Sequence, residues 1–395
     1  MDLVVENSKK WPKNSLIFLI LGIFSIVGGA ICVLIGILTP KPGQPELNFP
    51  EVGATKTDDK IYSNLTGLEL ADANLVTAPT YCIQTPNGTD GARPQAGLDQ
   101  AGVIFEAIAE AGITRFAAIY QNPTAAVIGP IRSLRLYYLQ WDTPFDCTIV
   151  HAGGADDALA AVRNGGYKDL TENYTYMYRS KTGNRLWNNL FTNATKLAEF
   201  TTDKGYTTSN VKGFARFTPE NAEKNRIDNT AAEKLVITEP AKGDTSALAP
   251  ITTEISFRFG NVPTYNVKYS YDVATNSYRR SYGNGNPHNI YSCPSEALGN
   301  ASPENSCTLT QMSPKVVIAM IVNERKASDN YHEDITTLGT GTAYVFQNGI
   351  AIKGTWTKNT VADQIIFKDE SGNEISLVPG QTFISAIPTY GSVDY

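Results

Sequence analysis

The feature that most constrains this chain is an uncharged apolar stretch near its start. Residues 16–38, LIFLILGIFSIVGGAICVLIGIL, contain no charged residue and no proline. At a rise of 1.5 Å per residue, such a helix spans a hydrocarbon core of about 30 Å. A buried helix of a soluble domain would carry a polar face, and a cleaved signal would have a shorter apolar core with small residues at its exit. We therefore predict a retained transmembrane helix over residues 16–38.

The charges around this stretch predict which way the chain crosses the membrane. Residues 1–15 carry three lysines close to the span, whereas residues 39–60 mix acidic and basic side chains. Because positive flanks stay in the cytoplasm, we predict a cytoplasmic tail over residues 1–15 and an extracytoplasmic location for the bulk of the chain. Cys32 raises the alternative of lipoprotein processing, but Ile31 stands where a small residue is expected. The proline-rich residues 39–60 predict a semi-stiff linker.

The overall charge argues against nucleic acid as a partner. The formal net charge is −6, which provides no basic footprint for a polyanion. Apolar residues make up 42% of the chain and charged residues 18%, as in an ordered globular protein. Frequent tyrosine, glycine, threonine and asparagine favour sheets and turns over long helices.

Four cysteines follow the predicted span, and an even number suits an oxidising location. Cys293 and Cys307 flank the polar loop PSEALGNASPENS, so a local disulfide across this loop is expected. By elimination, Cys82 pairs with Cys147, provided that their predicted strands are neighbours. Four free, buried thiols are the alternative, which is the norm in a cytosolic protein.

Residues 61–218 mix strand and helix patterns. The stretch VIFEAIAEAGITRFAAIYQ alternates on both sides of Ala111-Gly112 and predicts a hairpin, with a helix through Ala109 as the alternative. Its alternation places Glu106 and Glu110 on one face. The stretch ADDALAAVRNGG predicts a short helix that has acids in its first turn and a glycine stop. Together these patterns predict an α/β domain with a mixed sheet.

A second region differs in pattern from the first. Residues 219–250 are polar, charged and bounded by prolines, and they predict a connector. Residues 251–395 consist of short alternating runs separated by turns, which predicts a β-rich C-terminal domain. The expected fold class is thus α+β or α/β, with an N-terminal transmembrane helix, an α/β domain and a β-rich domain.

Basic residues and glycines gather at two predicted loop–helix junctions. The stretch IGPIRSLRLYYLQW predicts a helix that begins at Pro130, with two arginines on one face of it. The stretch TIVHAGG predicts a strand that ends at a histidine and two glycines. Such junctions lie where ligands bind open α/β sheets, and helix N-termini favour anions. The candidate ligand-binding residues are Arg93, Arg115, Arg132, Arg135, His151, Gly153 and Gly154.

A structural role for these arginines is the alternative. The acids available to pair with them are Glu106, Glu110, Asp142 and Asp146. For catalysis, His151 is the candidate, although no G-x-S-x-G elbow accompanies it. The histidines are scattered without metal-ligand spacing, so we expect no metal, and the glycines form no nucleotide-binding motif, so we expect no cofactor.

Several of these segments resemble a known family. ARPQAGLDQAGVIFEAIAEAGITRFAAIYQ, IGPIRSLRLYYLQW and VHAGGADDAL resemble hallmark segments of the YerB-like proteins, bacterial envelope lipoproteins with a domain of unknown function. WNNLFTN is similar to a further segment, and TLGTGTAYVFQNGIAIKGTWTK with DESGNEISLVPGQTFI resembles the second domain. The resemblance covers most of residues 75–218 and 251–390. It implies an extracytoplasmic two-domain protein with no established reaction, and it makes the seven candidate residues signature positions. The chain departs from the family in its apparent uncleaved span and in the Cys293–Cys307 segment.

The sequence supports three classes of function. The first is a membrane-anchored envelope protein that binds a polar or anionic ligand, or a protein partner, in a crevice of the α/β domain. The second is a hydrolase or transferase that acts on cell-wall polymer with His151 as its acid–base group. The third is a purely structural module, which needs no crevice.

Overall fold

A computed structural model describes residues 60–180, 187–226, 252–294 and 302–395. Within these ranges no helix combines the length and the apolar composition that a membrane span requires. The predicted span at residues 16–38 lies outside the described residues, as does nearly all of the predicted linker.

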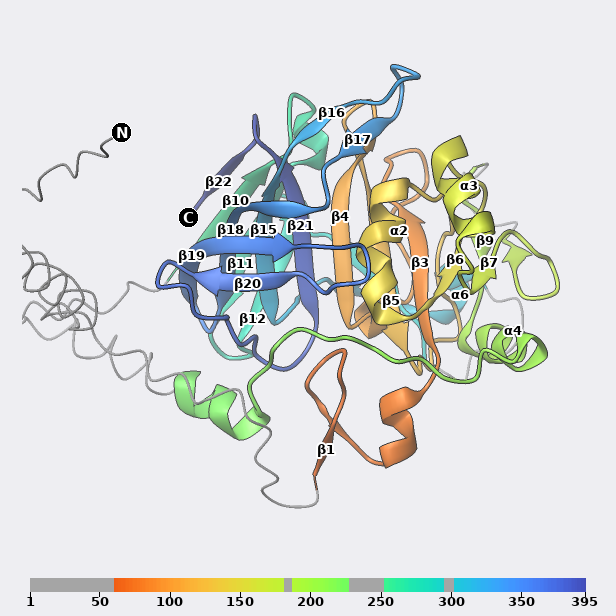
Figure 1. Cartoon of the computed structure of the whole chain (residues 1–395), viewed down its shortest axis with the longest axis horizontal. Helices are drawn as coiled ribbons and strands as arrows, with labels where there is room; N and C mark the ends of the chain where they lie inside the picture. The colour runs from red at the N-terminus through yellow and green to blue at the C-terminus, as the bar shows by residue number, and fades with distance from the viewer. Residues whose placement is uncertain (1–59, 181–186, 227–251, 295–301) are drawn as a thin grey trace, which may run out of the picture. The chain divides into compact units, whose positions relative to one another are not determined.

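The described residues fold around one mixed, ten-stranded sheet (Figure 1). From one edge to the other its strands are β20 (Ile366–Asp369), β19 (Ile350–Lys358), β18 (Gly339–Gln347), β15 (Val316–Val322), β21 (Thr382–Pro388), β4 (Val103–Glu110), β5 (Ile113–Gln121), β3 (Thr80–Pro86), β6 (Thr148–Val150) and β7 (Asp169–Leu170). β21 pairs in parallel with β4. The mixed sheet predicted for the first region is therefore confirmed, and strands of the second region continue it.

A smaller antiparallel sheet comes from the second region and its C-terminal end. Its strands, in order, are β12 (Ser277–Tyr282), β11 (Val267–Asp272), β10 (Glu254–Arg258) and β22 (Ser392–Asp394). Two-stranded ribbons pair β1 (Ile61–Tyr62) with β2 (Glu69–Leu70), β8 (Tyr178–Arg179) with β9 (Leu190–Phe191), β13 (Asn289–Ser292) with β14 (Thr308–Gln311), and β16 (Glu324–Lys326) with β17 (Glu333–Ile335). The β-rich character of the C-terminal region is confirmed.

In the described parts of the chain, helices are few and short. The α-helices are α2 (Leu136–Asp142), α3 (Asp156–Asn164), α4 (Ala194–Lys204) and α6 (Pro303–Ser306), and residues 219–226 are also helical. Short 3-10 turns are η1 (Ala73–Thr77), η2 (Leu98–Gln100), η3 (Thr143–Phe145) and η4 (Pro263–Tyr265). α3 is the helix predicted from ADDALAAVRNGG, with Asp156 and Asp157 in its first turn and Arg163 in its last.

The large sheet is covered on both faces. On one face Phe105 packs with Trp141 of α2 and Val162 of α3 in one apolar cluster. On the other face lie α4, which contributes Phe200, and the small sheet, which contributes Phe257. In Figure 1 the helices α2 and α3 lie in front of the large sheet and the small sheet lies behind it. This layering explains why the central strands are buried on both sides.

β4 and β5 form the predicted hairpin, and a bulge in β4 changes the direction of one acid. Ala111 and Gly112 form the tip with positive φ values of 50° and 77°, as a tight hairpin turn requires. The pairing register shifts between Ile108 and Glu110. Because one extra residue reverses the alternation of side chains, Glu110 turns to the α2 face of the sheet. The prediction that it shares a face with Glu106 is wrong for this reason.

Both predicted disulfides are present. Cys82 and Cys147 are bonded with a Cα–Cα distance of 5.7 Å, and Cys293 and Cys307 with one of 4.4 Å. The first bond joins β3 to the residue just before β6, and these two strands pair in parallel. The condition set for this pairing, that the two strands be neighbours, is therefore met.

The loop lengths predict how much each disulfide stabilises the fold. Cys82 and Cys147 are separated by 65 residues in sequence. Replacing both with Ala should lower the free energy of unfolding by about 4 kcal/mol, because the unfolded chain regains the entropy of this loop. The Cys293–Cys307 bond closes a shorter loop, with a sequence separation of 14, so the Cys293→Ala/Cys307→Ala variant should lose about 3 kcal/mol. Urea unfolding of the full chain in detergent, followed by tryptophan fluorescence, measures both. An unfolding midpoint that does not respond to reductant would contradict the pairing.

A buried ion pair joins the small sheet to the large one. Nη2 of Arg280, on β12, lies 2.8 Å and 3.0 Å from the carboxylate oxygens of Glu106, on β4, and neither side chain is exposed. Arg280 also donates to Nδ1 of His288, whose Nε2 lies 3.1 Å from Oε1 of Gln95. Burial, reinforced by the charges of Arg280 and Arg93, holds the pKa of His288 well below its usual range. The neutral ring therefore accepts from arginine and donates to glutamine.

Neutral side chains complete the contacts of this ion pair. Oγ1 of Thr114 donates to Glu106 at 2.9 Å, and Nδ2 of Asn87 donates to Thr114 at 2.8 Å. Nε2 of Gln95 donates to the carbonyl of Pro86 at 3.0 Å. A buried ion pair is tolerated when its remaining polar positions are satisfied in this way.

Removing one member of the pair should destabilise the protein more than removing both. Glu106→Leu should lower the free energy of unfolding by roughly 3–5 kcal/mol, because Arg280 is left charged and unpaired in the interior. The double variant Glu106→Leu/Arg280→Met should recover most of this loss, because no unpaired charge remains. Urea unfolding of the single and double variants tests this. A double variant no more stable than Glu106→Leu would contradict it.

Candidate functional site

Three neighbouring strands end at one edge of the large sheet. β3, β6 and β7 pair in parallel, so their carboxyl ends meet there. The segment 129–135 crosses this edge: the N–H of Arg132 donates to the carbonyl of Gln84 at 2.8 Å, and the N–H of Ala152 donates to the carbonyl of Arg132 at 3.0 Å. The structure thus brings Arg132 beside the turn at Gly153, at an edge where open α/β sheets bind ligands.

The helix predicted to begin at Pro130 begins at Leu136 instead. Arg135 precedes it in an extended conformation, with φ −125° and ψ 148°. Gly129 exchanges backbone hydrogen bonds with Ala96, so this part of the chain is strand-like. Proline is compatible with extended backbone as well as with the first turn of a helix. The position of Pro130 therefore led to an incorrect helix start. Arg132 and Arg135 therefore do not share a helical face.

Arg115 and Arg135 are both joined to the carboxylate of Glu110. Nη2 of Arg115 lies 2.7 Å from Oε1, Nη2 of Arg135 lies 2.6 Å from Oε2, and each arginine side chain is 5% exposed. Their Nη1 atoms donate to the carbonyls of Ser133 and Leu134. Burial opposes the charge of Glu110, but the two guanidinium groups outweigh it and lower the pKa of this carboxyl group. Both arginines therefore brace the segment before α2, in line with the structural alternative.

His151 is buried between two acceptors. Its side chain is 1% exposed, Nδ1 lies 2.7 Å from the carbonyl oxygen of Gly153, and Nε2 lies 2.9 Å from Oδ1 of Asp169. Because a carbonyl and a carboxylate are both hydrogen-bond acceptors, each ring nitrogen faces an acceptor within the fold. A ring held in this way orients the glycine turn, and both of its nitrogens are engaged.

The two glycines at this edge have different roles. Gly153 is exposed with a φ of 67°, and a side chain there would meet no other atom within 4 Å. Gly154 packs closely, since a Cβ atom there would lie 3.1 Å from the carbonyl oxygen of Leu134. The start of α3 is already occupied by an acid, because Oδ1 of Asp157 accepts from the N–H of Ala158. The open feature of this turn is therefore Gly153.

Arg93 makes contacts that differ from those of the other candidate arginines. Its guanidinium carbon is 3.8 Å from the ring centre of Tyr282 and 5.1 Å from that of Tyr265. Its Nε donates to Oδ1 of Asn87 at 2.8 Å, and burial lowers its pKa. Arg93 thus connects the loop after β3 to the small sheet and the buried ion-pair network.

Arg132 is the candidate arginine whose guanidinium group is bonded to a single main-chain carbonyl. Its side chain is partly exposed, and its Nη1 donates to the carbonyl of Trp187 at 3.2 Å. Within the described residues it has no carboxylate partner. Trp187 itself is 69% exposed, so the guanidinium group of Arg132 ends against the main chain of an exposed residue.

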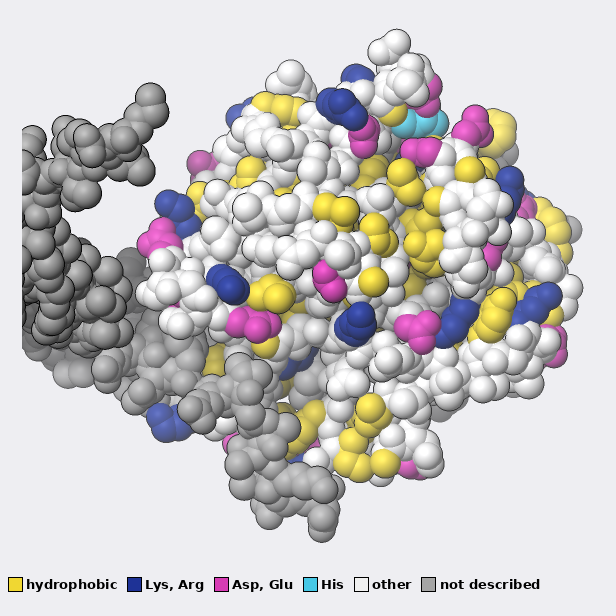
Figure 2. Space-filling view, viewed as in Figure 1, with side chains coloured by type: hydrophobic (Ala, Val, Ile, Leu, Met, Phe, Trp, Pro, Cys, Tyr) yellow, Lys and Arg dark blue, Asp and Glu magenta, His cyan; other side chains and the backbone are white. Residues whose placement is uncertain are grey.

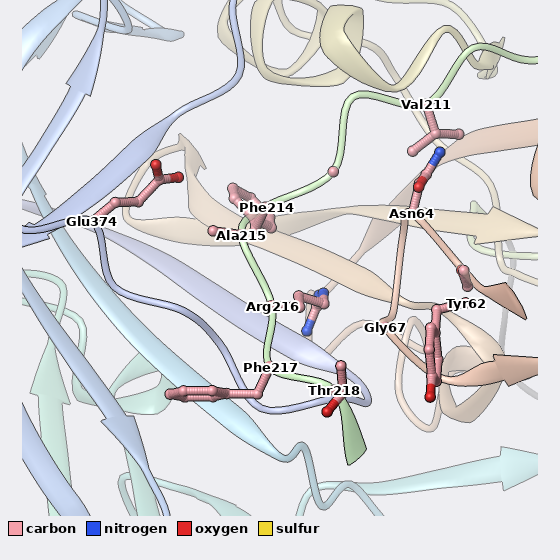
Figure 3. Close-up of a pocket in the computed structure, with 12 residues that line it drawn as sticks. Tyr62, Asn64, Gly67, Val211, Phe214, Ala215, Arg216, Phe217, Thr218 and Glu374 are labelled. Carbon is pink, nitrogen blue, oxygen red and sulfur yellow. The ribbon is translucent and has the colours of Figure 1, made fainter. Parts of the chain in front are cut away.

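A pocket that no sequence motif indicated lies elsewhere. It has a volume of about 460 Å3 and lies between a turn at residues 62–67 and an extended segment, residues 209–218, which we call the strap (Figure 3). Its lining residues are Tyr62, Ser63, Asn64, Gly67, Val211, Gly213, Phe214, Ala215, Arg216, Phe217, Thr218 and Glu374. These come from segments far apart in sequence, which is why spacing arguments missed them.

Sequence reasoning also missed an acid at the base of the β16–β17 ribbon. Glu324 accepts a hydrogen bond from the hydroxyl of Tyr390, while its Oε2 is buried without a partner in the described chain. Burial, together with the nearby charge of Glu333, raises its pKa to about 7. Its place directly after the apolar strand KVVIAMIVN was the available signal. No group of three or more histidine, cysteine or acidic side chains in the described ranges is placed to hold a metal ion.

The raised pKa of Glu324 predicts a pH-dependent stability. In the folded protein the carboxyl group of Glu324 keeps its proton up to about pH 7, whereas the ordinary pKa of a glutamate is 4.5. The contribution of Glu324 to the free energy of unfolding is therefore full below pH 4.5 and is lost as the pH rises through 7. Glu324→Gln should therefore reduce the difference in unfolding free energy between pH 5 and pH 7.5. Glu199→Gln, an exposed acid of α4, is the matched control. An unchanged pH dependence in Glu324→Gln would show that this carboxyl group is charged throughout.

Comparisons with known proteins show both domains of one family. Residues 65–207 match the N-terminal domain, and residues 255–384 the C-terminal domain, described as "Protein of unknown function (DUF3048)". The Bacillus subtilis (strain 168) protein named "Putative lipoprotein YerB" is 25% identical over 334 residues, which cover 84% of this chain and 88% of that protein. A crystal structure of the YerB protein from Bacillus subtilis matches with a TM-score of 0.63 and 21% identity, over 85% of this chain and all of that one. That likeness shows a shared fold.

Proposed function

Because the chain belongs to the DUF3048 family of two-domain, YerB-like proteins, as its motifs predicted, we propose that it is a membrane-associated envelope protein. In this proposal it binds a polar or anionic ligand, or a protein partner, without catalysing a reaction. The observation that carries this proposal is Arg132. Its guanidinium group is partly exposed and has no acidic partner in the described chain, whereas that of Arg93 packs on two tyrosine rings, and the main chain of Arg132 lies beside the open turn at Gly153.

Two observations support the envelope location. Both pairs of cysteines after the predicted span form disulfides, which persist in oxidising compartments and are rare in the cytosol. The Bacillus subtilis relative carries the name "Putative lipoprotein YerB". In this proposal the single span at residues 16–38 anchors the chain, with residues 1–15 in the cytoplasm and the domains outside.

The contacts of His151 favour binding over catalysis. Both of its ring nitrogens are engaged by Gly153 and Asp169, so neither is left to activate the hydroxyl of Ser133. A wall hydrolase or transferase that uses His151 would need that ring to gain and lose a proton during each turnover. The enclosed ring is suited instead to holding the turn in one conformation.

The surface charge favours a small anionic group over a long polyanion. On the face that carries α2 and α3, basic and acidic side chains are interspersed and do not gather into one field (Figure 2). A polyanion is usually bound by an extended basic patch. One partly exposed guanidinium group is instead suited to a single carboxylate or phosphate group.

Arg132 should be needed for binding to envelope material. Arg132→Gln should weaken cosedimentation of the full chain with purified Bacillus subtilis cell wall by roughly tenfold, because one charge-assisted hydrogen bond is lost. Arg163→Gln, an exposed arginine of α3, is the matched control and should bind like the unaltered chain. Equal losses in the two variants would mean that Arg132 contributes general charge and forms no site.

The same material tests the enzymatic alternative. Mass spectrometry of the supernatant should show no wall fragments released by the full chain. Fragment release that disappears in His151→Ala but persists in Arg163→Gln would overturn the proposal of a non-catalytic protein.

A further inference from the structure

We propose that the ligand of the Arg132 site is an acidic glycan, whose sugar rings stack on exposed aromatic side chains of the β8–β9 ribbon while its carboxylate or phosphate group binds Arg132. This inference deepens the proposed function and rests on it, because the charge required of the glycan is the one that Arg132 would bind. The ribbon surface, as we call it, consists of Arg132, Glu172, Tyr174, Arg179, Trp187 and Asn189.

The ribbon surface lies at the edge of the large sheet where β6 and β7 end. Leu190 of β9 packs in one apolar cluster with Val150 of β6 and Leu170 of β7, and Figure 1 shows these strands beside one another. The N–H of Ile131 donates to the carbonyl of Leu190 at 2.8 Å, so the chain just before Arg132 is bonded to the ribbon. Arg132 and the ribbon are therefore parts of one local surface.

Two aromatic side chains of the ribbon surface are exposed. Tyr174 is 61% exposed and Trp187 is 69% exposed. Tyr176 and Tyr178, from the same run of tyrosines, are 8% and 5% exposed and belong to the interior. Packing in the core therefore explains the two buried rings, whereas the two exposed rings are accessible to a ligand.

Hydrogen bonds hold the ring of Tyr174 in one orientation. Its hydroxyl donates to Oε1 of Glu172 at 2.5 Å and accepts from Nε of Arg179 at 2.8 Å. Nη2 of Arg179 donates to the same Glu172 oxygen at 2.5 Å, and the guanidinium carbon lies 6.0 Å from the centre of the tyrosine ring. Because these contacts already restrict the side chain, a ligand that stacks on the ring orders it at a smaller cost in entropy.

A series of contacts connects Tyr174 to Arg132 across the ribbon. Nη1 of Arg179 donates to Oδ1 of Asn189 at 2.6 Å. Asn189 is two residues from Trp187, whose carbonyl accepts from Nη1 of Arg132 at 3.2 Å. Each of these side chains is exposed or half-buried, so an extended chain molecule can contact them in succession.

The composition of the ribbon surface matches the chemistry of a sugar chain. A pyranose ring has a face of C–H groups, which packs on aromatic rings, and an edge of hydroxyl groups, which donate and accept hydrogen bonds. The two exposed rings provide the apolar contacts. Asn189 and Arg179 carry donors and Glu172 carries acceptors, so both functions of a hydroxyl group can be bound. Arg132, which has no acidic partner in the described chain, selects a glycan with an acidic substituent.

A lipid surface is the alternative occupant, because tryptophan and tyrosine are frequent at membrane interfaces. Protein surfaces that bind anionic lipid electrostatically carry several basic side chains. On the ribbon surface Arg179 is paired with Glu172, so Arg132 is the one base there without an acidic partner in the described chain. The balanced charges and the hydrogen-bonding side chains between the rings favour a glycan.

Peptide-free glycan strands and teichuronic acid, both from Bacillus subtilis cell wall, test the proposal by isothermal titration calorimetry on the full chain in nanodiscs. At least one of these acidic glycans should bind, and the one that binds identifies the source of the ligand. Tyr174→Ala and Trp187→Ala should each weaken this binding by about fivefold, because one stacking contact is lost. Tyr174→Phe keeps the ring and should lose less. Tyr331→Ala, 57% exposed between β16 and β17, is the matched control.

The same titrations separate the rings from the charge. The inference is overturned if neither acidic glycan binds, or if both aromatic variants bind like the unaltered chain. Loss of binding in Arg132→Gln alone would leave the proposed function standing without the glycan surface. Loss in the aromatic variants alone would overturn the proposed role of Arg132 and leave the glycan surface standing. Unchanged melting temperatures ensure that lost binding does not reflect unfolding.

Nanodiscs with brominated lipid test the lipid alternative, because bromine quenches the fluorescence of a tryptophan in contact with lipid. The fluorescence that Trp187→Phe removes from the full chain should be equal in brominated and ordinary nanodiscs. A smaller contribution of Trp187 in brominated nanodiscs would show that its ring lies in lipid and would overturn the proposal.

Discussion

The ion pair between Glu106 and Arg280 determines how the two halves of this protein can be arranged. Glu106 lies in the middle of β4, where a carboxylate without a partner would be too costly to bury. Its partner comes from β12, in the second region, and His288 and Gln95 hold the arginine in place. The two domains that the family comparisons distinguish therefore share one buried network as well as one sheet. Neither region satisfies this interior without the other.

Local patterns predicted the parts of the fold that depend on local physics. The hairpin of β4 and β5 follows from alternation around Ala111-Gly112, and α3 from its acidic first turn and glycine stop. The disulfides followed from one short loop and elimination, because only four cysteines were available outside the predicted span. In each case the determining contacts involve neighbours in sequence or a small number of possible partners.

The features that sequence missed depend on contacts between distant segments. The bulge that turns Glu110 toward α2 has no local signal, since the alternation of β4 continues through it. The chain from Gly129 to Arg135 has a helical spacing of apolar residues, but bridges to Ala96 and to the turn after β6 keep its first part extended. The conformation of this segment is determined by backbone hydrogen bonds to distant parts of the fold.

Motif membership alone does not distinguish a bracing arginine from a binding one. Arg115 and Arg135 share the single carboxylate of Glu110, and their removal would disturb the start of α2. Arg132 shares the segment IGPIRSLRLYYLQW with Arg135, yet its partly exposed side chain ends against a main-chain carbonyl. Arginines more often support a fold than bind a ligand, so the exposed group without an acidic partner is the informative exception.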